Sequence, residues 1–107
     1  MKLIRKEVGV KKKYRSVQIG ARKFKIKYVT SIKEGEMELA GLYNCNEQTI
    51  YIKHPSETRE RITEVLMHEI THGILFALGE FELGNDEKFV CKVAALMAQV
   101  LLTMEVK

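Results

Sequence analysis

The spacing of apolar residues changes once along the chain, near Pro55. Before it, apolar and polar residues alternate in short runs, which is typical of strands with one buried face. Turn-prone sequences such as KEGE and NCNE separate the runs, so we expect three or four antiparallel strands. The last two runs are expected to form a hairpin, because only about five residues separate them. The runs cover Val17–Ile19, Lys23–Val29, Met37–Tyr43 and Thr49–Ile52.

Beyond the proline, apolar residues recur at helical spacing and predict a first helix over residues 56–79. Ser56 is the expected N-cap, and Glu60 is an acid in the first turns, where it complements the helix dipole. Gly79 can adopt the left-handed conformation that ends a helix. A short loop over residues 80–84 is expected to follow.

A second helix is predicted over residues 86–104, beginning at Asn85 or Asp86. Its apolar residues recur on one face. Strands followed by helices, with no repeat and no linker between them, indicate an α+β fold in which both share one core. The apolar face comprises Phe89, Val93, Leu96, Met97, Val100 and Met104.

The length of 107 residues fits one domain, and an apolar content of 46% is ordinary for a folded protein. We expect a basic N-terminal segment over residues 1–15 and a mainly antiparallel sheet of three to four strands over residues 16–53, with the two helices beyond it. Neither a signal peptide nor a membrane span is apparent, and Cys45 and Cys91 are too few for a disulfide scaffold. These features favour a cytoplasmic protein with reduced thiols and no membrane contact.

The net charge of +4 arises mainly in the first quarter of the chain. A basic face of this kind can bind phosphate, which makes nucleic acid a candidate partner. However, the lysines of RKFKIKYV alternate with Phe24, Ile26 and Tyr28, as on the exposed face of a half-buried strand. No recognised nucleic-acid motif accompanies the charge, so a solvated strand face is the favoured interpretation. The basic residues are Lys11, Lys12, Lys13, Arg22, Lys23, Lys25 and Lys27.

The sequence MHEITHG places His68 and His72 one helical turn apart on the first predicted helix. Two imidazoles at this spacing can bind one metal ion from the same side, as in HExxH zinc sites. With a third protein ligand, zinc keeps an open position where a water molecule becomes acidic. We therefore predict one zinc ion per chain, held in part by these two histidines.

Glu69 follows the first of these histidines and falls on the side of the helix that carries Ile62, Val65 and Leu66. Burying an ionised carboxylate costs several kcal/mol unless it has a partner. The partner we expect is the activated water, whose proton Glu69 would take as general base. An arginine or a backbone group is the alternative partner. Gly73 faces the same side, which predicts close approach of the sheet or of the second helix.

The third ligand is expected among the acids that follow the first helix, since His54 would reach the site only if the chain folded back. Glu87 is favoured, because it lines up on the second helix with small side chains that permit close packing of the two helices. Asp86 is expected to cap that helix, and Glu80 and Glu82 to lie in the loop, and these three remain the alternatives. The small side chains belong to Cys91, Ala94 and Ala98.

With HEITHG on the first helix, GLYNCNEQTIYIKH before it and NDEKFVCKVAALMAQVL after it, the chain resembles the small gluzincin-like zinc metallopeptidases. It is most similar to their minimal soluble members, the minigluzincins, and to short phage-type proteins related to the ImmA/IrrE and SprT-like groups. The resemblance spans nearly all of the chain. It implies a small zincin-like fold, in which a twisted sheet packs over the HExxH helix.

For the site, the resemblance implies zinc bound by His68, His72 and Glu87. It also implies that Glu69 is the general base and that a peptide substrate adds along an edge strand, here from the hairpin over residues 37–52.

Two departures from the family stand out. Larger gluzincins carry an aspartate or asparagine four residues after the ligand glutamate, where this chain has Cys91, and this affects how a histidine is oriented. They also have a large C-terminal subdomain that is missing here, so we expect a shallow cleft. The residue that stabilises the oxyanion stays open among Tyr43, Tyr51 and His54.

The expected function is that of a zinc-dependent metalloendopeptidase, a hydrolase acting on a cytosolic and regulatory protein. The alternative is a zinc-stabilised module without activity that binds a protein partner or nucleic acid. A fourth protein ligand, for instance Cys91 or His54, would favour the module, whereas an exchangeable water would favour the enzyme.

Overall fold

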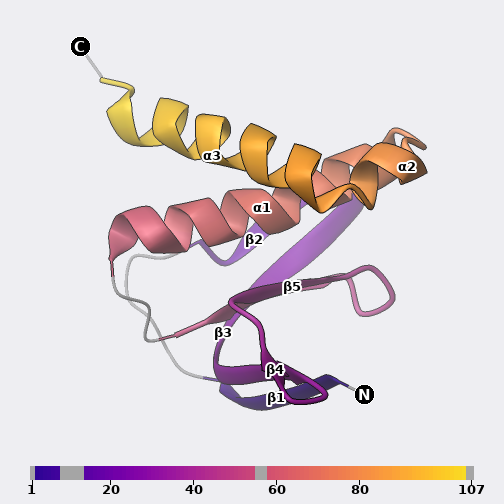
Figure 1. Ribbon diagram of the computed structural model, residues 1–107, viewed down its shortest axis with the longest axis vertical. Coiled ribbons are helices and arrows are strands. Elements are labelled where there is room, and N and C mark those ends of the chain that lie inside the picture. The colour runs from indigo at the N-terminus through magenta and orange to yellow at the C-terminus, as the bar shows by residue number, and fades with distance from the viewer. Residues whose placement is uncertain (1, 8–13, 55–57, 106–107) are drawn as a thin grey trace.

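The computed structural model describes residues 2–7, 14–54 and 58–105 and confirms an α+β fold. Two long helices lie together on one side of a sheet (Figure 1). All described strands precede the helices in the chain, as the sequence pattern predicted. The helices are α1 (Arg59–Ala77), the short α2 (Phe81–Gly84) and α3 (Glu87–Thr103). The strands are β1 (Lys2–Glu7), β2 (Ser16–Ile19), β3 (Arg22–Glu34), β4 (Met37–Glu38), β5 (Gly41–Asn44) and β6 (Thr49–Lys53).

The sheet has six strands, and its main path runs β1–β3–β6–β5. With 13 residues, β3 is long enough to pair with β2 along its first part and with β1 and β4 along its last part. Most pairings are antiparallel, as expected. The exception is β6, the second strand of the β5–β6 hairpin, which runs parallel to β3. β5 forms one edge of the main path, and within the described residues it pairs with β6 alone.

The sequence pattern missed two features of this sheet. Residues 2–7, which were assigned to a basic N-terminal segment, form β1. The pattern did not reveal this strand, because charged residues surround the few apolar ones there. The strand predicted over residues 37–43 is divided into β4 and β5. The Leu39 N–H still donates to the Ile32 carbonyl of β3, whereas the Ala40 carbonyl already accepts a hydrogen bond from β6. The chain therefore crosses from one neighbour to the other between these two residues.

The helix ends largely follow the sequence signals. Ser56, the expected cap, lies outside the described residues, and Thr58 is the N-cap of α1, with a hydroxyl that accepts a backbone hydrogen bond at 3.0 Å. Gly79 has a φ of 76° and follows α1 in the left-handed conformation that we predicted. Residues 80–84, expected to be a loop, contain the one-turn helix α2. Asp86 caps α3 in the same way as Thr58 caps α1, at 3.1 Å.

α3 packs on α1 through a narrow stripe of Val90, Ala94 and Ala98, each at most 2% exposed. The predicted close packing of the small side chains is confirmed, whereas the apolar face of this helix is covered only in part. α3 packs on α1, and α1 lies between α3 and the strands (Figure 1). The exposed fractions are 62% for Leu96, 57% for Val100 and 65% for Met104, whereas Phe89, Val93 and Met97 are partly buried.

The contact at Ala98 can be tested by enlarging its side chain. We predict that Ala98→Leu lowers the free energy of unfolding by about 1–3 kcal/mol, because the added atoms do not fit between α1 and α3. Ala95→Leu makes the same change at an exposed position of the same helix and should alter that free energy by less than about 0.5 kcal/mol. Urea unfolding followed by circular dichroism measures both, and equal effects would contradict the close contact.

Candidate metal centre

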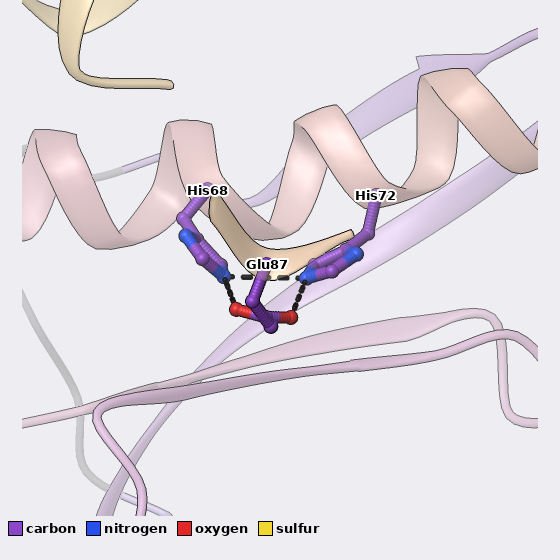
Figure 2. A group of neighbouring side chains, drawn as sticks. All are labelled: His68, His72 and Glu87. Carbon is purple, nitrogen blue, oxygen red and sulfur yellow. Dashed lines mark hydrogen bonds and ion pairs between the residues drawn. The ribbon is translucent and has the colours of Figure 1, made fainter. Parts of the chain in front are cut away.

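The three predicted ligands lie together in one cluster, here called the metal triad. His68 and His72 project from the same side of α1, and Glu87, the first residue of α3, places its carboxylate between them (Figure 2). The Nε2 atoms of the two imidazoles are 3.2 Å apart. Oε2 of Glu87 lies 3.1 Å from Nε2 of His68, and Oε1 lies 3.0 Å from Nε2 of His72.

The separation of the two histidine nitrogens is close to one edge of a tetrahedral metal site. Two ligand atoms about 2.0–2.1 Å from one zinc ion lie about 3.3 Å apart at the tetrahedral angle. The two Nε2 atoms, 3.2 Å apart, are close to that value, and each of them lies 3.0–3.1 Å from a different oxygen of Glu87. In the described part of the chain, no fourth histidine, cysteine or acid joins the group. The triad can therefore hold a metal ion through three side chains.

The hydrogen bond of His72 explains why the triad favours a cation. Its Nδ1 donates to the carbonyl oxygen of Gly84 at 2.7 Å, so the neutral ring carries a lone pair on Nε2. That lone pair faces the Glu87 carboxylate at 3.0 Å and the Nε2 of His68 at 3.2 Å. Acceptor atoms repel at such distances unless a proton or a metal ion lies between them. The donor set by itself thus calls for a positive charge.

His68 is oriented by a thiol rather than by a carboxylate. Sγ of Cys91 lies 3.7 Å from Nδ1 of His68, at the position where larger gluzincins carry an aspartate or asparagine. A thiol is a weak hydrogen-bonding group, so it fixes the ring less firmly than an acid would. Burial lowers the pKa of His68, and the neighbouring Glu87 carboxylate opposes this shift. The lowered pKa favours the neutral imidazole, which is the form that binds metal ions.

Glu69 is buried, as predicted, with 7% of its surface exposed. It lines a cavity of about 310 Å³, here called the Glu69 cavity, together with His68 and with Gly41 of β5. A β-carbon on Gly41 would lie 3.1 Å from Oε2 of Glu69 and 2.7 Å from Cγ1 of Val65, so β5 passes directly beside the carboxylate. The carboxylate and a metal ligand therefore face one cavity at the edge of the sheet.

The alternative ligands lie outside the metal triad. Asp86 accepts the capping hydrogen bond of α3, and neither Glu80 nor Glu82 belongs to the group that could hold a metal. The ring of His54 meets Tyr28 edge-on, and its buried Nδ1 has no hydrogen-bond partner among the described residues. Within this part of the chain, Glu87 is thus the acid that completes the site.

The described lining of the Glu69 cavity includes none of Tyr43, Tyr51 and His54. The Tyr51 hydroxyl donates to a carboxylate of the β5–β6 turn at 2.8 Å. Tyr43 packs on α1 at Gly73, where a β-carbon would lie 3.0 Å from its ring, and burial raises the pKa of Tyr43 to about 12. The sheet, rather than the second helix, is therefore what approaches Gly73. Arg61, which the sequence did not single out, lines the Glu69 cavity two turns before His68.

The basic residues on β3 follow the pattern of a half-buried strand. Arg22, Lys23 and Lys25 are exposed, whereas Phe24 and Ile26 between them are buried. The three consecutive lysines near the N-terminus, Lys11, Lys12 and Lys13, lie outside the described residues. Nucleic-acid binding stays a prediction.

Comparisons of the chain with models of protein families, with curated proteins and with solved structures found no match. The resemblance to gluzincins consequently depends on the motif and its surroundings alone. Among the described residues, no helix combines the length and the apolar character needed to cross a bilayer.

Metal loading tests the metal triad directly. We predict that the protein binds one zinc ion per chain and that His72→Ala or Glu87→Ala removes it during dialysis, because two ligands are too few to retain it. Glu82→Ala, which removes an exposed acid of α2, is the matched control and should keep the ion. Elemental analysis by mass spectrometry measures the content.

Zinc at 100 times its dissociation constant should also raise the free energy of unfolding of the wild type by about 2.7 kcal/mol. The two ligand variants should show no such gain. If the two ligand variants retain zinc and are still stabilised by it, the ion binds at a site other than the metal triad.

Proposed function

We propose that the protein is a zinc-dependent metalloendopeptidase, a hydrolase that cleaves a regulatory protein in the cytoplasm. One observation carries the proposal, namely the position of Glu69. This carboxylate is buried, directly follows a metal ligand in the chain and faces the same cavity as that ligand. A metal ion that served only to hold two helices together would need no such group, whereas hydrolysis needs a general base at this place.

The chain's own residues divide the chemical work. Zinc held by His68, His72 and Glu87 would supply an acidified water molecule. The Glu69 carboxylate accepts the proton of the attacking water and later delivers it to the amine that leaves. The Gly84 carbonyl holds the His72 ring in the tautomer that presents Nε2 to the centre.

β5 provides a place for an extended peptide. The Ala40 carbonyl accepts a hydrogen bond from β6 at 2.8 Å. In an antiparallel pair, every second residue directs its N–H and C=O groups toward the partner strand, so those of Leu42 also face β6. The backbone groups of Gly41 and Tyr43 consequently point to the free edge, where a peptide can add as another strand. Because Gly41 lies against the general base, such a peptide would pass beside it.

The second candidate is a zinc-stabilised module that binds a protein partner or nucleic acid. A fourth protein ligand would favour it, because structural zinc sites are closed. Cys91 is the nearest thiol, but it contacts Nδ1 of His68 rather than the metal-facing Nε2, and His54 is outside the metal triad. The described contacts therefore support the enzyme over the module.

Glu69→Gln separates the two candidates. We predict that this variant keeps its zinc but loses at least about 100-fold in kcat/KM, because an amide cannot accept the proton. Glu64→Gln is the matched control: it removes an exposed carboxylate from the same cavity and should keep most of the activity. Hydrolysis of quenched fluorescent peptides measures both.

Two outcomes would count against the proposal. Full activity of Glu69→Gln would show that this residue is not the base. A zinc-loaded wild type that hydrolyses no peptide would instead favour the binding module.

A further inference from the structure

A second cavity lies at the far end of the β5 edge, and we call it the aromatic pocket. It has a volume of about 370 Å³ and is formed by the end of α1, the β2–β3 turn, β5 and the start of α2. Four aromatic side chains line it, and two small residues of α1 leave room between them. The residues that the argument uses are Phe24, Tyr43, Gly73, Phe76, Ala77 and Phe81.

The aromatic pocket begins one ring away from the metal triad. Phe76 stacks on His72 with ring centroids 6.2 Å apart and planes inclined by 15°. It also packs against Phe81 at 6.1 Å and against Tyr43 at 5.9 Å. A side chain held in this pocket would therefore belong to a residue close to the bond at the metal centre.

The direction of β5 decides which part of a peptide meets the aromatic pocket. β5 runs from Gly41, beside Glu69, to Tyr43, beside the pocket. Antiparallel pairing is the more stable arrangement, and it makes an added peptide run the opposite way. The amino-terminal part of the peptide then lies at Tyr43. Because opposite residues of such a pair share a face, the side chain opposite Tyr43 points toward α1 and the pocket.

We propose that the aromatic pocket selects a large apolar or aromatic side chain on the amino-terminal side of the cleaved bond. This inference depends on the proposed endopeptidase function and names the substrate class of that site. At the rim of the pocket, Nη1 of Arg22 donates to Sγ of Cys45 at 3.0 Å. The residues named above, which line the rest of the pocket, are aromatic or small, so an apolar side chain would lie mainly against apolar surface.

Cleavage of a randomised peptide mixture by the zinc-loaded protein, with products identified by mass spectrometry, tests the inference. We expect phenylalanine, tyrosine or leucine to be enriched one or two residues before the cleaved bonds. Cleavage without a preference on that side would overturn the inference while leaving the proposed function intact. Enrichment of glutamate there would also overturn it, since it would assign the pocket to the Arg22 guanidinium.

Truncating the pocket provides the second measurement. Phe81 is 62% exposed, so Phe81→Ala removes a wall of the aromatic pocket with little risk to folding. We expect kcat/KM to fall about tenfold for a peptide with phenylalanine at the selected position and little for the same peptide with alanine. Leu78→Ala removes a similarly exposed apolar side chain, 69% accessible, that does not line the pocket, and it should change neither value. Equal losses for both peptides would contradict the inference.

Binding to the zinc-loaded Glu69→Gln variant separates the inference from the proposed function. Fluorescence anisotropy of labelled phenylalanine and alanine peptides reports affinity without any hydrolysis. We expect the phenylalanine peptide to bind about tenfold more tightly, and Phe81→Ala in this background to remove the difference. If the wild type cleaves no peptide, the proposed function fails. The selectivity of the aromatic pocket is overturned by a different result, namely equal affinities for the two peptides.

Discussion

The close contact between α1 and α3 is the constraint on which the candidate site depends. Ala94 and Ala98 are almost fully buried between the two helices, and their small side chains bring the first residue of α3 to within 3.1 Å of His68. A wider spacing would withdraw Glu87 and leave two imidazoles, which are too few to anchor a metal ion. The stripe of small residues is therefore a condition for the third ligand. Leu96, Val100 and Met104 lie away from this contact and are exposed.

Glycines play the corresponding role between α1 and the sheet. Because Gly41 has no side chain, the β5 backbone lies against the Glu69 carboxylate, and Gly73 gives the rings and methyl groups of the sheet access to the backbone of α1. The helices thus carry the metal ligands and the base, while the sheet edge carries the backbone groups that a peptide would pair with. Close approach on both sides of α1 makes these two sets of groups neighbours.

The sequence predicted the centre of the site better than its surroundings. His68, Glu69 and His72 lie within one helical turn, so local geometry alone determines how they face one another. Glu87 could be predicted as the third ligand because it lies in line with a stripe of small residues, and such a stripe indicates that two helices pack closely. How much of the apolar face of α3 is covered could not be predicted, since apolar periodicity shows which residues are apolar and not which of them a neighbour covers. The carbonyl that orients His72 could not be identified, because every residue has one and only α2 places that of Gly84.

The short connection between the ligands has a consequence for how the metal ion would act on the fold. Only residues 73–86 separate the second histidine from Glu87, and α2 already orders part of them. The entropy of closing a chain segment grows slowly with its length, so closing this one costs little. A bound ion would then restrain the unfolded chain only slightly. Its main mechanical effect would be to join α3 to α1, so that removal of the ion would loosen the helical hairpin while the strands keep their pairing.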